Sequence, residues 1–377
     1  MRLLSVLLCM ILCLTGCSQE VSTELSNRLI IEAIGIDTDA AGYKVSVLAL
    51  NTMQTGSAGS TDAPDGIAKV FTATGSSIAE AFSQLDLVST QIPLYSQARV
   101  LIIGKEVAEN QPLSALNFFM REYTIRDDIP VAVSEATANK IITAEPGKSE
   151  LVSKIIDNLL TSGARNGQTV NVPLYSFISC LLNETDAAYL PVLKVEKNVQ
   201  NKDEIRSAGI ALFANENYTA TLNGATMEGF LYANNLIDSI LLEIEYQNQD
   251  IALAVRKIKA KTKINKKDQS VFSVDISFSC DIVEQNSLQQ SFNVQDIEQI
   301  KILAQEKVKK YMQDFLYYTM YDCACDCLGF GKRIRNKYPT HYEEIRENYT
   351  SFLRTAQITV VANASIHRPG REVLLGK

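Results

Sequence analysis

Few residues of this chain are of types that could do chemistry. Its 377 residues include eight cysteines and only two histidines, His341 and His367. One thiol, Cys17, ends the sequence Leu14-Thr15-Gly16-Cys17, and the residues before it are small. A basic residue and then an apolar run from Leu3 to Leu14 come first, which is the order of a secretory signal. We therefore expect the chain to be exported and then cleaved near this cysteine.

The apolar run is too short to stay in the membrane. It has 12 residues, whereas a membrane-spanning helix needs about 20, so we interpret residues 1–16 as an export signal. The Leu-x-Gly-Cys arrangement resembles the lipobox of bacterial lipoproteins. This resemblance implies that Cys17 receives a diacylglyceryl group and that the chain is cut just before it; two acyl chains give stable anchoring. The alternative is an ordinary secretory signal in which Cys17 is incidental.

The thiols beyond Cys17 suggest packing more than metal binding. They form an odd set that cannot pair completely, so we expect mostly free, buried thiols: Cys180, Cys280, Cys323, Cys325 and Cys327. The last three fall at the end of a predicted helix, where residues four apart share a face. No histidine or further cysteine lies at a ligand spacing, so the four ligands of structural zinc are incomplete. We predict no metal site.

No catalytic set stands out either. Neither histidine has a neighbour that suggests a triad, and the sequence lacks Gly-x-Ser-x-Gly, His-Glu-x-x-His and a glycine-rich phosphate loop. Gly329-Phe330-Gly331 is only a fragment of a dinucleotide-binding fingerprint. The pairs Asp127-Asp128 and Glu343-Glu344 favour solvated faces. We predict no catalytic residue and no cofactor, although an active site can assemble from distant residues.

The composition is that of a globular protein. Hydrophobic residues make up 46% and charged residues 21%. The formal net charge of −7 argues against nucleic acid as a partner and against a general polybasic attraction to anionic lipid. No second apolar run approaches the length of a membrane span. At roughly 150 residues per domain, two or three domains are expected.

Strands and helices alternate in the first half. After a polar tether over 17–27, the ranges 29–36 and 43–50 predict a hairpin. Ser77 and Glu80 form the capping box of a helix. Further strands are expected at 70–73, 98–103, near 131 and at 189–195, with helices at 112–121, 149–160 and 174–182. This order predicts helices packed on a sheet.

The second half is expected to form its own sheet. A polar run over 197–206 predicts a linker between an N-terminal domain, 28–196, and a C-terminal domain, 207–377. Asn223-Gly224 is a strong turn signal. Strands are predicted at 208–213, 218–222, 239–245, 251–264, 271–280 and 356–366.

One long helix should dominate this half. It is expected to begin at Asn293 or Asp296, to run to about Cys327 and to end at Gly329 and Gly331, with another helix after Pro339. The predicted fold class is mixed α/β of the α+β type, multi-domain, with mainly antiparallel or mixed sheets flanked by helices.

Lysine alternates with apolar residues along one predicted strand, at Lys257, Lys259, Lys261 and Lys263. A period of two with one basic face indicates a half-buried strand. The face could bind lipid headgroups or an acidic partner. We favour the alternative, an edge strand whose lysines block pairing with another sheet.

Several stretches in order, spread over nearly all of the mature chain, resemble the Ger(x)C family of spore-germination lipoproteins, the C subunits of nutrient germinant receptors. In the first half these are Ala33-Ile34-Gly35-Ile36-Asp37, Val100-Leu101-Ile102-Ile103-Gly104-Lys105-Glu106 and Arg121-Glu122-Tyr123-Thr124-Ile125-Arg126. In the second half these are Gly209-Ile210-Ala211-Leu212-Phe213, Leu222-Asn223-Gly224, Asp326-Cys327-Leu328-Gly329-Phe330-Gly331 and Lys337-Tyr338-Pro339.

The chain departs from the family pattern at a few aromatic positions. Ser18, Tyr342 and Tyr349 stand where the family often has tryptophan, and Gln97 stands where relatives often carry histidine. Tyrosine keeps an aromatic body for packing. Any role of the missing histidine is not carried over to this chain.

The resemblance implies a lipoprotein on the outer face of the spore inner membrane, assembled with integral-membrane receptor subunits of the A and B types. It implies a non-enzymatic scaffold needed for nutrient-triggered germination. Two alternatives remain open. An extracytoplasmic solute-binding lipoprotein requires a deep cleft between the halves, and a lipid-anchored hydrolase requires a cleft with perturbed carboxylates or an activated nucleophile.

Overall fold

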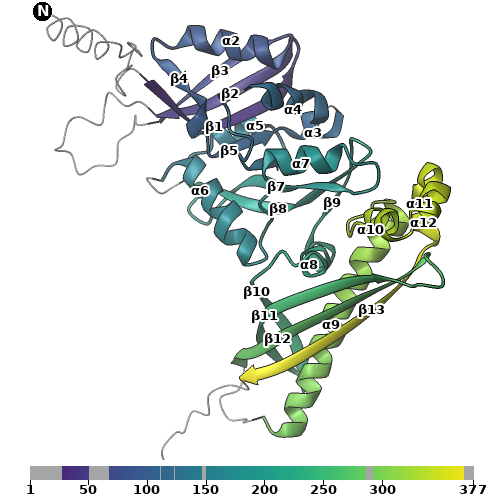
Figure 1. Cartoon of the computed structure of the whole chain (residues 1–377). Coiled ribbons are helices and arrows are strands. Elements are labelled where there is room, and N and C mark those ends of the chain that lie inside the picture. Colours follow the sequence, from purple (N-terminus) through teal and green to yellow (C-terminus); the bar gives the residue numbers. More distant parts are fainter. Residues whose placement is uncertain are drawn as a thin grey trace, which may run out of the picture.

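The described part of the chain forms two mixed sheets, one above the other in Figure 1. The computed structural model describes residues 28–50, 68–110, 112–122, 124–146, 150–285 and 292–368. The helix α8 (Gly224–Ala233) connects the two sheets along the chain. The mixed α+β fold predicted from the sequence is confirmed.

The first sheet has nine strands in the order β3-β2-β1-β5-β6-β7-β8-β9, with β4 beside β1. The strands β1, β4, β5, β6 and β7 run parallel, so they all begin at one end of the sheet. Their bounds are β1 (Arg28–Asp39), β2 (Gly42–Leu50), β3 (Ala68–Gly75), β4 (Ile92–Leu94), β5 (Val100–Ile103), β6 (Val131–Ser134), β7 (Ala188–Lys197), β8 (Asp203–Ala214) and β9 (Asn217–Leu222).

Helices cover both faces of this sheet, and each face has its own apolar cluster. One face is covered by α2 (Ile78–Val88), α3 (Lys105–Asn110), α4 (Pro112–Arg121) and α7 (Leu174–Leu181), and the other by α5 (Ala138–Ile142), α6 (Val152–Asn158) and the π-helical turn η4 (Leu159–Gly163). A short 3-10 helix, η3 (Tyr95–Gln97), precedes β5. The predicted cap of α2 is confirmed, because the Ser77 hydroxyl accepts from the Glu80 N–H at 3.2 Å.

The second sheet has four strands in the order β10-β11-β12-β13. One long helix packs along its inner face (Figure 1). The strands are β10 (Ser239–Tyr246), β11 (Gln249–Ile264), β12 (Val271–Gln285) and β13 (Gln357–Arg368). The helices are α9 (Val294–Tyr317), its π-helical extension η5 (Tyr318–Asp322), α10 (Phe330–Lys337), α11 (Pro339–Ile345), η6 (Arg346–Asn348) and α12 (Tyr349–Thr355).

The predicted start of the long helix is confirmed, but its predicted end is wrong. Asn293 caps α9, and its side chain and that of Asp296 bond to each other's backbone N–H. The helix ends at Asp322, because Ala324 adopts a positive φ of 52°. Gly329 also has a positive φ, of 66°, and it lies at the start of α10 instead of ending the long helix.

The predicted linker is not an unpaired segment. Residues 197–206 form the exposed end of the β7–β8 hairpin, in which Lys197 pairs with Asp203. The first sheet continues through β9, so the change from one sheet to the next falls between Leu222 and Ser239. A polar run is typical of the solvent-exposed end of a hairpin and also of a linker, so the composition alone does not distinguish the two.

The lysine-rich part of β11 lies at a partial edge. Its neighbour β10 pairs with β11 only as far as Arg256, and residues 259–264 pair with β12 alone. Lys257 lies at a break in the register with β12 and has a positive φ of 54°. The four lysines are exposed, and Lys263 contacts Asp275 at 2.5 Å. The Asn235 side chain bonds to both backbone groups of Ala260 on the open side. The edge-strand interpretation therefore fits this half of β11.

Candidate functional site at the junction of the two sheets

The predicted lipidation residue, Cys17, lies outside the described residues, as does the signal before it. Its lipidation stays a prediction. Within the described ranges, no helix is long and apolar enough to cross a bilayer.

The cysteines near the end of the long helix do not share a helical face. Cys323, Cys325 and Cys327 lie in the loop between η5 and α10. All five cysteines of the described chain are free, and Cys280 and Cys325 are fully buried, whereas the other three are partly exposed. Burial raises the pKa of Cys280 to about 12 and that of Cys325 to about 11, so both are neutral thiols. The described residues contain no group of three or more potential ligands that could hold a metal ion.

The two histidines lie on different elements of the second half. His341 is on α11, where its Nδ1 is 3.2 Å from the Glu344 carboxylate. His367 is exposed on β13, with Ser365 as its side-chain partner. The acidic pairs are on the surface, and both Asp128 and Glu343 pair with arginines. The structure brings none of these candidates together into a catalytic arrangement.

One buried carboxylate, that of Asp326, lies at the junction where the second half of the chain contacts the first. Asp326 is 2% exposed, and its Oδ2 accepts from the Gly331 N–H at 2.8 Å and from the Tyr349 hydroxyl at 2.7 Å. Its Oδ1 accepts from the Leu328 N–H at 3.2 Å. Burial raises the pKa of Asp326, and the bonds from Tyr349 and Gly331 offset this only in part.

The backbone of Asp326 joins the second half to the first. Its carbonyl accepts from the Ala187 N–H at 2.9 Å, and Asp326 forms a β-bridge with Asp186, just before β7. Gly331 packs on Thr185, where a Cβ would lie within 2.6 Å of the Thr185 side chain. This role was not predicted from the sequence; the available signal was a lone carboxylate within the apolar run from Cys325 to Gly331.

A second buried carboxylate joins two of the motifs that suggested the family. Asp37 ends the first motif, and its oxygens accept from the N–H groups of Ala138 and Asn139 at 2.7 and 2.9 Å. It thereby caps α5. Burial raises the pKa of Asp37. A Cβ on Gly104, in the second motif, would overlap the Asp37 Oδ1, so this site needs glycine.

The two tyrosines that stand at tryptophan positions have different environments. Tyr349 donates to the buried Asp326 carboxylate, as an indole N–H could. The Tyr342 hydroxyl is buried and has no hydrogen-bond partner among the described residues. The hydroxyl of Tyr349 therefore forms a buried hydrogen bond, whereas Tyr342 contributes its ring to packing. Gln97 is exposed at the end of η3.

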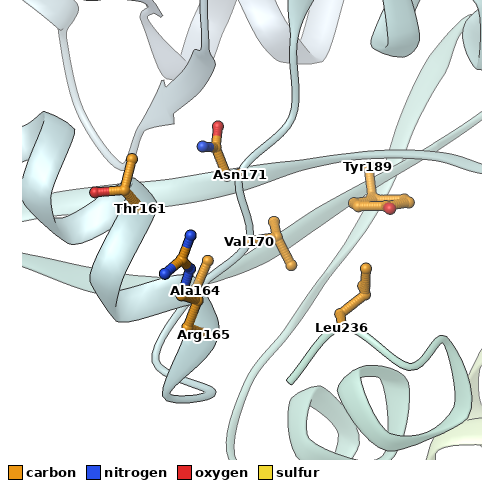
Figure 2. A pocket seen from close by; sticks show the side chains of 7 residues that line it. All are labelled: Thr161, Ala164, Arg165, Val170, Asn171, Tyr189 and Leu236. Carbon is orange, nitrogen blue, oxygen red and sulfur yellow. The ribbon is translucent and has the colours of Figure 1, made fainter. Parts of the chain in front are cut away.

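A small pocket opens beside the connection between the sheets. It has a volume of about 270 Å³. Figure 2 shows Thr161, Arg165 and Asn171 on one side of it and Tyr189 and Leu236 on the other. Small-molecule sites are commonly about 300–1,000 Å³ and enclose most of the ligand. This pocket is smaller, so it does not favour the solute-binding alternative.

A larger pocket of about 440 Å³ lies under β4, between α2 and α4. Its floor is aromatic, with Phe82 stacked on Phe118 at 5.0 Å and Tyr95 edge-on to Phe82 at 5.1 Å. Asp86 accepts from the Tyr95 hydroxyl at 3.0 Å, and Glu122 lies on the rim. The pocket therefore has an aromatic floor and two carboxylates, those of Asp86 and Glu122, among its lining residues.

Comparison with known proteins identifies the family. The model of a spore germination protein N-terminal domain matches residues 22–195, and the model described as spore germination B3/GerAC like, C-terminal, matches residues 208–370. The chain belongs to the Ger(x)C family of spore germination proteins. The two Ger(x)C models meet within the β7–β8 hairpin, not at the change of sheet.

Individual Ger(x)C relatives are distant but cover much of the chain. The spore germination protein GerQC of Bacillus cereus is 21% identical over 290 residues, covering 74% of this chain and 76% of the relative. The spore germination protein KC of Bacillus subtilis (strain 168) is 22% identical over 378 residues, covering 92% and 90%. The crystal structure of the GerBC protein has the same fold, with a TM-score of 0.55 at 13% identity, covering 88% of this chain and 96% of that one.

Proposed function

We propose that this protein is the lipid-anchored C subunit of a spore nutrient germinant receptor. It acts as a non-enzymatic interaction protein at the outer face of the spore inner membrane, beside integral-membrane subunits of the A and B types. The observation that carries the proposal is the pair of Ger(x)C matches over residues 22–195 and 208–370, directly behind the Leu14-Thr15-Gly16-Cys17 sequence.

The junction supports an interaction role. Asp326 and its partners hold the two halves against each other, and the apolar cluster that includes Leu190 of β7 also includes Phe230 of α8 and Phe315 of α9. A body built in this way presents fixed surfaces to its partners. A lipid anchor would restrict it to the membrane plane and raise its effective concentration near them.

The experiment replaces the anchor residue. In Cys17→Ala the thiol that would carry the lipid is absent, so we expect the protein to leave the spore membrane fraction and nutrient-triggered germination to fall. Cys13→Ala is the matched control, because it removes a cysteine of the signal and leaves Leu14-Thr15-Gly16-Cys17 intact. Mass spectrometry of the mature N-terminus of the parent protein should find a diacylglyceryl group on Cys17.

Two results would count against the proposal. One is normal membrane retention and normal germination of Cys17→Ala. The other is a mature N-terminus that is unmodified or that begins beyond residue 17. A thermal-shift screen with amino acids and sugars addresses the solute-binding alternative, and a clear, saturable stabilisation would favour it.

A further inference from the structure

Three exposed apolar side chains lie close together at one corner of the first sheet. Leu87 and Val88 end α2 with exposures of 77% and 56%, and Ile92 begins β4 with an exposure of 48%. Single exposed apolar residues are common on protein surfaces, whereas a cluster marks a contact site for a protein or a membrane. We call Leu87, Val88 and Ile92 the α2–β4 corner.

The corner lies where the described chain begins. β4 pairs with the start of β1, and Ile92 is opposite Arg28 (Figure 1). Arg28 comes 11 residues after Cys17. A chain of that length reaches at most about 40 Å when fully extended, and about 20 Å on average when flexible. A lipid on Cys17 would therefore hold this corner close to the bilayer surface.

The segment that runs from the end of α2 into β4 carries no charged side chain. Residues 87–96 contain no Asp, Glu, Lys or Arg. Two carboxylates, Asp86 and Glu122, lie beside this segment, and that of Asp86 accepts a hydrogen bond from Tyr95. Charged side chains are costly at depth in a bilayer, whereas apolar residues and tyrosine are favourable at its interface. The exposed surface is therefore suited to the boundary between headgroups and acyl chains.

We propose that the α2–β4 corner inserts into the headgroup region of the phospholipid bilayer beside the anchor. This inference rests on the proposed lipidation of Cys17 and adds a second point of attachment. Two attachments fix the orientation of the body, whereas a single lipid anchor leaves it free to rotate. The parallel strands that begin at the corner end at the opposite side of the first sheet, and Val199, beyond the end of β7, then faces away from the membrane.

The chain contains no tryptophan, so a single introduced tryptophan reports on one position. The test uses the full-length, lipidated protein in vesicles of phosphatidylcholine and phosphatidylglycerol whose acyl chains carry bromine, a quencher of indole fluorescence. Leu87→Trp and Ile92→Trp probe the corner. Val199→Trp is the matched control, because Val199 is also exposed and apolar but lies beyond the end of β7, at the other end of the parallel strands. Thermal unfolding verifies that each variant is folded.

We expect the emission of Leu87→Trp and Ile92→Trp to shift to shorter wavelength and to be largely quenched. The emission of Val199→Trp should not change. Flotation of the vesicles on a density gradient distinguishes the proposed lipid anchor at Cys17 from the proposed insertion of the α2–β4 corner. Protein that floats with the vesicles but remains unquenched at both corner positions overturns the insertion and leaves the anchor standing. Protein that fails to float overturns the anchor and the insertion together.

Discussion

At the scale of single residues, three buried carboxylates of the core have specific partners. Asp326 accepts from two backbone N–H groups and one hydroxyl, and Asp37 accepts from two N–H groups. Glu32, 4% exposed, bonds to Arg99 at 2.7 Å and to Ser153 at 3.0 Å. Hydrogen bonds to ionised groups are stronger than neutral ones. The loss of one donor should therefore be measurable.

Removing the hydroxyl of Tyr349 should destabilise the protein, whereas removing that of Tyr342 should not. Tyr349→Phe removes one of the three donors to the buried Asp326 carboxylate, which costs about 1–3 kcal/mol of unfolding free energy. Tyr342→Phe removes a buried hydroxyl that has no partner among the described residues, so we expect no loss or a small gain. Urea unfolding measures both. Equal losses for the two variants would contradict this account of Asp326.

At the scale of elements, the strands and helices that could be predicted are those with a recognisable pattern in the sequence. The strands of both sheets other than the short β4, and the capped start of α9, were predicted, because alternating apolar residues and the Asn293 and Asp296 side chains act locally. The end of the long helix was misjudged, because the turn depends on Ala324 and not on a glycine. The helix α8 was missed, because its buried residues are consecutive, from Gly229 to Ala233, and show no helical period.

α8 lacks a helical pattern in its sequence because it packs closely against neighbouring elements. α8 lies between the two sheets and crosses α9, and a Cβ at Gly229 would overlap the Tyr311 carbonyl oxygen. Asn223-Gly224, predicted as a turn, begins this helix. The burial of its last five residues follows from the tertiary arrangement, so a residue-by-residue pattern cannot indicate it.

A methyl group at Gly229 should therefore separate α8 from α9. We expect Gly229→Ala to cost about 1–3 kcal/mol of unfolding free energy, as for other overpacked cores. Gly163→Ala is the control: it is also helical, but its Cβ would meet only the movable side chains of Leu159 and Gln168 at 3.1 and 3.3 Å. That variant should lie within about 1 kcal/mol of the parent, since alanine favours helix. Denaturant midpoints compare the two, and a larger loss at Gly163 would refute the prediction.

At the scale of the whole molecule, the halves share one core. Tyr189 of β7 contacts Phe230 of α8 at 4.9 Å between ring centres, and Phe230 contacts Phe315 of α9 at 5.7 Å. The division into domains 28–196 and 207–377 stays a proposal, since β8 and β9 pair within the first sheet. The Asp326 junction could not be predicted from the sequence, because its partners are far away along the chain.

The stability of this joined body should depend on pH through Asp326. Burial raises its pKa in the folded state above the ordinary value of about 3.9. The contribution of Asp326 to stability is then fully present below that value and is lost as the pH rises through the folded pKa. We therefore expect the unfolding free energy of the parent, relative to that of Asp326→Asn, to fall as the pH rises from about 4.

Urea unfolding at a series of pH values measures this difference. Asp128→Asn is the control, because its side chain is 62% exposed and on the surface. Parallel curves for the parent and Asp326→Asn would show that Asp326 does not titrate differently in the folded state.

The pairing of β13 with β12 has a consequence for how the chain matures. These strands run parallel, and α9, α10, α11 and α12 all lie between them in the sequence. Synthesis delivers β13 only after these four helices, whereas every strand of the first sheet has already left the ribosome once Leu222 has. The second sheet therefore gains its last strand well after the first sheet has all of its strands, so a premature stop codon before Gln357 would leave α9 and β12 without it.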